Sequence, residues 1–436
     1  MKKLLILMLA LTLALSACAA NTVNAPTNAP ASPASGASST PVQTNSKLTL
    51  AIAAYEDGFI PPEVNSLVQT FNADNPACEI TVKSYAADKL TAEIIAGTVP
   101  DIIMTQGIPF DSWAVKGLFE NLAPYIDAEA ELELVPAYRT ALSTGDALFR
   151  IGNSFAVQTS YGNAELVGAE PGWSFDEMLE SLKNAPKNYD LLSSIEGQSR
   201  EGYTEFLLYQ NLDSFIDWES GEVYFDSPDF KKLLTFINGY PSRPEGSNLA
   251  APEPKDPLVN RARYGRESVK MYPTFDNSLN GKLAFKGFPG DAKAVSALDL
   301  EASAFAISAA SNAKDTAWRF IRGVVTAETG GGNIGYTFPV LKSEFDKIIS
   351  AARSPVAENE ALLINGKPRE QMTQTQTDKF LNMLNSAKHV MGSASDDILR
   401  SIINDETGAY YAGQKTVDEV CEIIQSRASI YIAEQS

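Results

Sequence analysis

Aromatic and hydrogen-bonding side chains follow two stretches of the chain that have the pattern of strands. Tyr55 and Glu56 come shortly after the apolar alternation of residues 48–52, and Gln106 follows the strand predicted at residues 100–104. An aromatic ring packs on the apolar C–H face of a sugar, and a carboxylate or amide bonds its hydroxyls. These residue types predict a site for a small polar ligand, with carbohydrate as the favoured class. The alternative for each of them is a solvated loop.

The elements expected to position these residues alternate between strand and helix. Strands are predicted at residues 48–52, around Ile80 and Val82, and at residues 100–104. The helix between the first two begins at Pro62, and its buried face consists of Val64, Leu67, Val68 and Phe71. This order indicates right-handed βαβ units in a mainly parallel sheet, whose ligands collect beyond the carboxyl ends of the strands.

Three further helix starts are marked by their capping residues. Residues 174–177 and 416–419 are capping boxes, and Ser227-Pro228 is a third helix start. Trp173 and Met178 occupy the two positions of a hydrophobic staple, which favours a structural role for Trp173. The buried positions of the third helix are predicted to be Phe230, Leu233, Leu234 and Ile237.

The sequence lacks the motifs of several common catalytic sites. It has no Gly-x-Ser-x-Gly elbow, phosphate-binding glycine loop or His-Glu-x-x-His helix, and His389 is its only histidine. The 54 acidic residues guarantee some close carboxylate pairs, so such pairs alone do not indicate a glycosidase. We expect no enzyme, no cofactor and no metal. Whether Cys78 and Cys421 form a disulfide stays open.

The N-terminus resembles a bacterial lipoprotein signal. Lys2 and Lys3 precede an apolar run over residues 4–15 that is too short to span a bilayer, and the run ends in Leu15-Ser16-Ala17-Cys18. Cleavage after residue 17 would leave Cys18 to carry the diacylglycerol, with an acyl chain such as palmitate on its amine. Residues 18–46 are rich in Ala, Ser, Thr, Asn and Pro and are predicted to be a disordered tether.

Length limits the architecture of the remaining body, and charge limits its partners. Residues 47–436 exceed the usual size of a single core, so two lobes are expected. The formal net charge of the chain is −19. This acidity disfavours nucleic acid and anionic lipid as partners, because both require a basic surface.

Several segments together resemble the family 1 extracellular solute-binding proteins of ABC importers, the group that includes maltose-binding protein. The resemblance implies two α/β lobes of the class II periplasmic-binding type, each a mainly parallel sheet flanked by helices, which close on ligand in the cleft between them. The implied first lobe takes residues 47–157 and 289–335, and the second takes residues 158–288 and 336–436. The similar segments are residues 97–103, 117–122, 173–178, 225–228, 306–308, 317–321 and 338–340.

The resemblance also implies further ligand-binding residues. Residues 271–277 are similar to a loop that presents a stacking aromatic ring, which makes Tyr272 or Phe275 the main candidate unless one or both belong to the core. Tyr161 falls in the first crossover between the lobes, Trp218 in a turn, and Tyr336 beside the second crossover. Ile108 and Pro109 stand where maltose-binding protein has a charged pair, which argues against maltose itself.

The function implied by this resemblance is capture of a sugar or oligosaccharide and its delivery to an ABC permease, by a monomer anchored to the cell membrane through Cys18. Two alternatives stay open. In the first, the solute is a polyamine, a peptide or an anion. In the second, the protein is a sensory lipoprotein that presents its ligand to a receptor.

Overall fold

The computed structural model describes most of the chain that follows the predicted tether. The described residues belong to the unit Thr44–Ser436. They are residues 46–54, 58–193, 198–217, 220–242, 255–290, 293–300, 304–327, 336–356, 369–391 and 394–435. The predicted signal peptide, Cys18 and the tether up to residue 45 lie outside them, as do Tyr55, Glu56 and Trp218.

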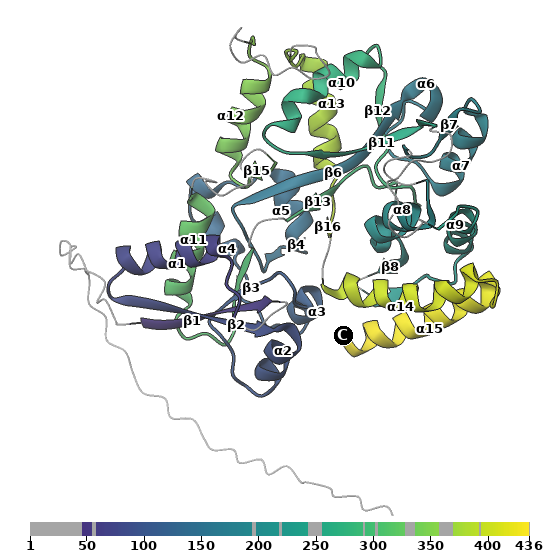
Figure 1. Cartoon of the computed structure of the whole chain (residues 1–436). Helices are drawn as coiled ribbons and strands as arrows, with labels where there is room; N and C mark the ends of the chain where they lie inside the picture. Colours follow the sequence, from purple (N-terminus) through teal and green to yellow (C-terminus); the bar gives the residue numbers. More distant parts are fainter. Residues whose placement is uncertain are drawn as a thin grey trace, which may run out of the picture. The chain divides into compact units, whose positions relative to one another are not determined.

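The first sheet has four strands in the order β14, β3, β1, β2 (Figure 1). β1 (Ser46–Ala54) pairs in parallel with β2 (Cys78–Ala86) and β3 (Ile102–Met104), whereas β14 (Phe305–Ile307) is antiparallel to β3. The parallel order predicted for the first three strands is therefore confirmed. A segment far later in the chain completes the sheet.

Side chains of β1 alternate between two hydrophobic clusters, as the period of a strand requires. Leu50 and its neighbours on the same face join α1 (Pro62–Asp74) and α11 (Lys314–Thr326). Ala51, on the other face, joins α2 (Ala87–Ile95) and α3 (Phe110–Val115). Helices thus cover both faces of the sheet. At its carboxyl edge, β2 continues directly into α2, and β3 leads into the loop of residues 105–109.

The second sheet is centred on the long strand β6 (Ser154–Asn163) and differs from the prediction of a mainly parallel sheet. β11 (Val259–Tyr264), β12 (Leu283–Phe285), β13 (Ala297–Asp299) and β15 (Phe338–Pro339) are all antiparallel to β6. Only β16 (Val390–Met391) runs parallel to its partner, β13. The prediction failed here because the strand and helix alternation that supported it lies in residues 48–104.

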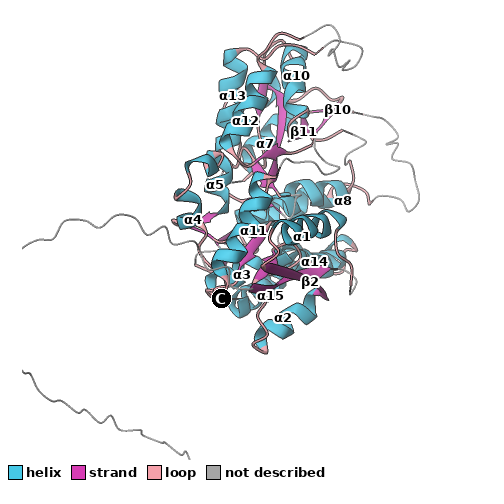
Figure 2. Ribbon diagram, turned by 90° about the vertical axis from the view of Figure 1, so that its left-hand side faces the viewer, coloured by secondary structure: helices cyan, strands magenta, loops and turns pink. Residues whose placement is uncertain are grey.

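The two faces of the second sheet pack against different helices, which Figure 1 shows on opposite sides of β6. Phe155 and Val157 face α10 (Tyr272–Ser278), α12 (Lys342–Ala352) and α13 (Gln374–Asn385), which Figure 2 shows grouped together. On the other face, Val259 and Ala284 join α7 (Phe175–Asn184), α9 (Pro228–Asn238), α14 (Ala394–Tyr411) and α15 (Val417–Gln435).

Short elements connect these layers. The first group is α4 (Ala123–Asp127), η1 (Ala130–Leu132), α5 (Pro136–Leu142) and the hairpin of β4 (Ser143–Thr144) with β5 (Ala147–Leu148). The second group is α6 (Ala164–Val167), β7 (Tyr189–Asp190), α8 (Arg200–Tyr203), η2 (Thr204–Leu208), η3 (Tyr209–Phe215), β8 (Ile216–Asp217), β9 (Glu222–Val223), β10 (Asp256–Pro257) and η4 (Ser268–Met271).

The three predicted helix starts are confirmed. Ser174 and Glu177 form both bonds of the capping box, and the Thr416 hydroxyl accepts a bond from the Glu419 N–H. Ser227 caps α9, whose four predicted core residues are all buried. Cys78 and Cys421 are both buried and free, so they form no disulfide.

The capping box at Ser174 makes a small part of the stability dependent on pH. The Ser174 N–H and then the Lys293 ammonium lower the pKa of Glu177 from 4.5 to about 2. A carboxyl group with a depressed pKa in the folded state stabilises above about pH 4.5, and this contribution disappears as pH falls toward about 2. We expect Glu177→Gln to lower the free energy of unfolding by less than about 1 kcal/mol near neutral pH, because the side chains of Glu177 and Lys293 are both about half-exposed. The difference from wild type in urea unfolding should shrink at about pH 3, and a constant difference would contradict the assignment.

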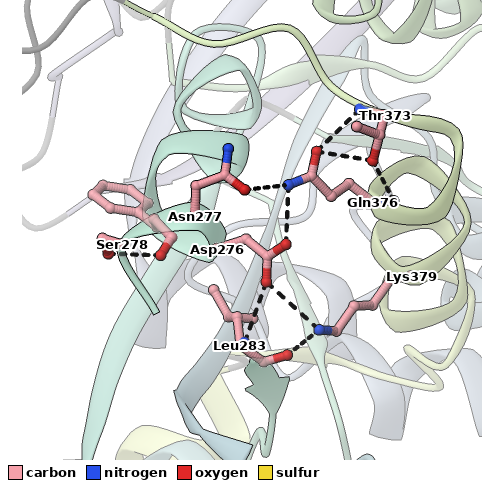
Figure 3. A network of polar contacts seen from close by, with 8 residues as sticks. Asp276, Asn277, Ser278, Leu283, Thr373, Gln376 and Lys379 are labelled. Atoms are coloured by element: carbon pink, nitrogen blue, oxygen red, sulfur yellow. Dashed lines mark hydrogen bonds and ion pairs between the residues drawn. The ribbon is translucent and has the colours of Figure 1, made fainter. Parts of the chain in front are cut away.

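α10 is fastened to α13 and β12 through the buried carboxylate of Asp276 (Figure 3). Asp276 accepts bonds from the Gln376 amide at 2.9 Å and from the Leu283 N–H at 3.2 Å. The Lys379 ammonium lies 3.7 Å from the same carboxylate and donates to the Leu283 carbonyl. Gln376 also accepts from the Thr373 N–H at the start of α13, so a single side chain both caps one helix and ties it to another.

Candidate functional site

The loop after β3 lies against the end of β1, as the parallel order requires. The Thr105 N–H donates to the Ala304 carbonyl at 2.8 Å, which holds the loop on the first sheet. Gly107 has a φ of +75°, and a Cβ there would lie 3.5 Å from Ala53. Gln106, between them, is exposed. Its side chain is therefore available to a ligand at the carboxyl edge of this sheet.

A cationic side chain packs on the helix that follows this loop. The guanidinium carbon of Arg150 is 4.1 Å from the centre of the Phe110 ring, and Phe110 begins α3 four residues after Gln106. Cation–π contacts of this kind fix the position of a guanidinium. Directly after Arg150, Ile151 and Phe305 exchange both backbone bonds, at 3.0 and 2.9 Å.

The chain passes between the two sheets at this point more than once. Residues 149–153 lead from the β4–β5 hairpin into β6, and the chain returns from β13 to β14 through residues 300–304, of which 301–303 are not described. β15 joins the start of β6, where Phe338 pairs with Phe155. Side chains on these strands are therefore positioned where the two sheets connect.

A polar network ties these connecting strands together. One carboxylate oxygen of Asp299, in β13, accepts from the Gln158 amide at 2.9 Å and from Arg263 Nε at 3.0 Å. Arg263 Nη1 donates to the Tyr336 carbonyl at 2.8 Å. The side chains of Arg263 and Asp299 keep 25% and 22% of their surface exposed, so solvent or a ligand reaches them. We call Gln158, Arg263 and Asp299 the crossover network.

Among the described aromatic candidates, Tyr336 is the one that contacts the crossover network. Its residue is 65% exposed, and its backbone carbonyl accepts the bond from Arg263. An aromatic ring together with an amide and a guanidinium is the combination of groups that a sugar-binding site uses.

The structure places the other described aromatic candidates elsewhere. Tyr272 is fully buried, with its ring 5.4 Å from Phe285 and 6.0 Å from Phe380. This agrees with the alternative that one of the rings of residues 271–277 belongs to the core. Burial raises the pKa of Tyr272, because its ionised form would lack solvent. The ring is not accessible to a ligand in this conformation.

Phe275 and Tyr161 are partly buried and stack on each other, with ring centres 6.1 Å apart. Strand alternation places Tyr161 on the opposite face of β6 from Gln158. Tyr161 therefore lies on the face that packs against α13 and α10, the helix that contains Phe275, and away from the crossover network.

Sequence reasoning missed all three members of the crossover network. Each is a polar residue within a strand of the second sheet. Gln158 lies more than a hundred residues before the other two, and Arg263 and Asp299 are 36 residues apart. A polar residue in such a strand is a usable signal of a functional role or of a buried hydrogen bond. The strand pairing that brings them together was not predictable from local patterns.

Two surface cavities lie away from this site. One, of about 620 Å³, lies between α4, η1 and α5 and is lined by Asp127, Glu129 and Glu133 among others. The other, of about 520 Å³, lies between α7 and α9 next to Pro289 and Gly290. Neither contains a predicted site residue. Among the described residues no group of three metal-binding side chains occurs, and no helix there has the length and apolarity needed to cross a bilayer.

Comparisons with solved structures find related folds at low sequence identity. A putative oligosaccharide periplasmic-binding protein from Synechococcus sp. MITs9220 has 16% identity and a TM-score of 0.51, covering 89% of this chain and 99% of that one. The sugar-binding protein MalE from Xanthomonas citri has 15% identity and a TM-score of 0.49, covering 89% and 98%. Maltose-bound MalE3 from T. maritima has 16% identity and a TM-score of 0.48, covering 88% and 99%. The Synechococcus protein supports the two-lobed periplasmic-binding fold.

Comparison with curated proteins finds no match. A family model described as "Bacterial extracellular solute-binding protein" matches residues 66–415, well over half of the 436 residues. Members of this family bind solutes outside the cytoplasm. The resemblance that the sequence segments indicated is thereby confirmed, and the chain belongs to the bacterial extracellular solute-binding proteins.

Proposed function

We propose that this protein captures a sugar or oligosaccharide and delivers it to the permease of an ABC importer. The observation that carries the proposal is the crossover network and its contact with Tyr336. Amide, carboxylate and guanidinium groups there lie where the two sheets connect, and the guanidinium bonds the backbone carbonyl of the exposed Tyr336. Gln106, exposed at the carboxyl edge of the first sheet, supplies a second amide.

The described relatives support carbohydrate as the solute class. The Synechococcus protein with the same fold is described as a putative oligosaccharide-binding protein. We infer that this chain likewise binds its solute between two lobes and acts as a binding protein without catalysis.

The lobes proposed from the sequence are residues 47–157 with 289–335, and residues 158–288 with 336–436. The pairing of β13 with β6 and of β14 with β3 favours a return to the first lobe between Asp299 and Phe305, somewhat later than residue 289. Closure of such lobes on the solute would be driven by contacts that exist only in the closed form. We further propose a monomer held at the cell membrane by lipid on Cys18.

A thermal-shift screen tests the solute class. Monosaccharides and oligosaccharides are compared with amino acids, peptides and polyamines, and a ligand at a hundred times its Kd should add about 2.7 kcal/mol of stability. A shift with one saccharide class, together with compaction in small-angle scattering, supports the proposal. A shift with peptides or polyamines alone would overturn the carbohydrate assignment.

A further inference from the structure

We propose that the saccharide bound by this chain is acidic, and that Arg261 binds its carboxylate. This inference rests on the proposed function and adds the chemical class of the sugar. The side chains that support it share one face of the second sheet.

The register of the second sheet places two arginines on the face of the crossover network. In the antiparallel pair of β11 with β6, Arg263 lies opposite Gln158 and Arg261 lies opposite Ser160. Residues two apart on a strand project to the same side. Because Arg263 bonds Asp299 on the side of Gln158, the Arg261 side chain projects from that face as well.

A third cation continues the same row. Lys286 directly follows β12, and its N–H donates to the Ser160 carbonyl, so the β12 register continued by one residue sets Lys286 opposite Ser160. The residue is only 3% exposed, and its ammonium donates to the Glu170 carbonyl at 2.8 Å. Burial lowers the pKa of Lys286, and the charges of Glu177 and Glu170 only partly offset that effect. Ser160 therefore has a cationic residue on each neighbouring strand.

Two of these three cations have acidic neighbours. Arg263 forms an ion pair with Asp299, and the charges of Glu177 and Glu170 favour the charged form of Lys286. Arg261 differs from both. Its residue is half-buried, and among the described residues its guanidinium has neither a hydrogen-bond nor an ion-pair partner.

A guanidinium in this position favours one kind of partner. Its planar set of N–H donors matches the two oxygens of a carboxylate, and a partly buried charge is stabilised most by an opposite charge. A uronic acid residue presents a planar carboxylate on a ring whose hydroxyls suit the amide of Gln158, which lies on the same face of the sheet as Arg261. The same set of donors also takes two oxygens of a phosphate or sulfate ester. We assign the carboxylate, and the sulfated series in the test decides between the two kinds of anion.

The test is calorimetric titration of the whole protein with matched saccharides. Oligogalacturonides, neutral galacto-oligosaccharides of the same length and sulfated galacto-oligosaccharides are compared at low and moderate salt. We expect the uronate series to bind at least about tenfold more tightly than the neutral series, because a bond to a charged group is the stronger kind. The advantage should decrease as salt is added.

Arg261 is tested with a matched pair of variants. Arg261→Gln should weaken uronate binding about tenfold or more while changing neutral binding less than about twofold, and Arg261→Lys should restore part of the loss. Arg353→Gln, at an exposed arginine after α12, should leave both affinities unchanged. Melting temperatures without ligand verify that each variant is folded.

The outcomes distinguish a failure of the acidic-sugar inference from a failure of the proposed sugar-binding function. Tighter binding of neutral or sulfated sugars, or full uronate affinity in Arg261→Gln, would overturn the inference and leave the sugar-binding function standing. Binding of no saccharide in any series would instead overturn the proposed function.

Discussion

Replacing Asp276 with alanine is expected to lower the free energy of unfolding by about 3 kcal/mol, because removing the shared acceptor of a buried polar network breaks one bond of each partner. Asp276 is 5% exposed and accepts from Gln376 and the Leu283 N–H. The Lys379 side chain is 34% exposed, so solvent replaces most of its ion pair. The Gln376 amide would keep only its 3.4 Å bond to Asn277, and the Leu283 N–H would lose the Asp276 acceptor. These two losses account for most of the expected effect.

Urea unfolding followed by circular dichroism measures this effect. Asp378→Ala, at an exposed aspartate on the same helix α13, is the matched control and should change stability by less than about 0.5 kcal/mol. Equal effects of the two substitutions would mean that α10 and α13 are held by their apolar contacts alone.

Local patterns predicted the elements whose cause is local. The capping residues of α7, α9 and α15 make bonds three residues along the chain, so their chemistry is visible in the sequence. The βαβ order of residues 46–104 follows from alternation and helical spacing in one short stretch. The second sheet resisted prediction because its strands pair across long separations, such as Leu283 with Asn163.

The candidate site also contains residues that local patterns predicted and residues that they did not. Gln106 was predictable because it directly follows a strong strand pattern, and the structure leaves it exposed. Tyr272 and Phe275 were chosen for residue type and resemblance. Neither criterion shows against which face of the second sheet a side chain packs. Asp299 and Arg263 gain their meaning only from the register with β6, which places both on the face of Gln158.

Replacing Arg263 with methionine is expected to weaken solute binding about thirtyfold, since bonds to charged groups contribute about 1.5–3 kcal/mol each. Methionine fills much of the volume of the arginine stem but offers no donor. Asp299 would then lose its cationic partner, and the Tyr336 carbonyl would lose the bond at 2.8 Å. The connecting strands would be held less rigidly, and an uncompensated carboxylate would face the solute.

The measurement is the Kd of the solute identified in the screen, with small-angle scattering to follow closure. Arg139→Met is the matched control, because Arg139 forms an ion pair with Asp127 on α4, away from the crossover network, with side chains 37% and 56% exposed. An exposed pair contributes little, so that variant should bind the solute normally. Normal binding by Arg263→Met as well would reduce the crossover network to a structural tie between β6, β11 and β13. A thirtyfold loss with unchanged melting temperature would place Arg263 at the solute, since a purely structural role would lower stability and affinity together.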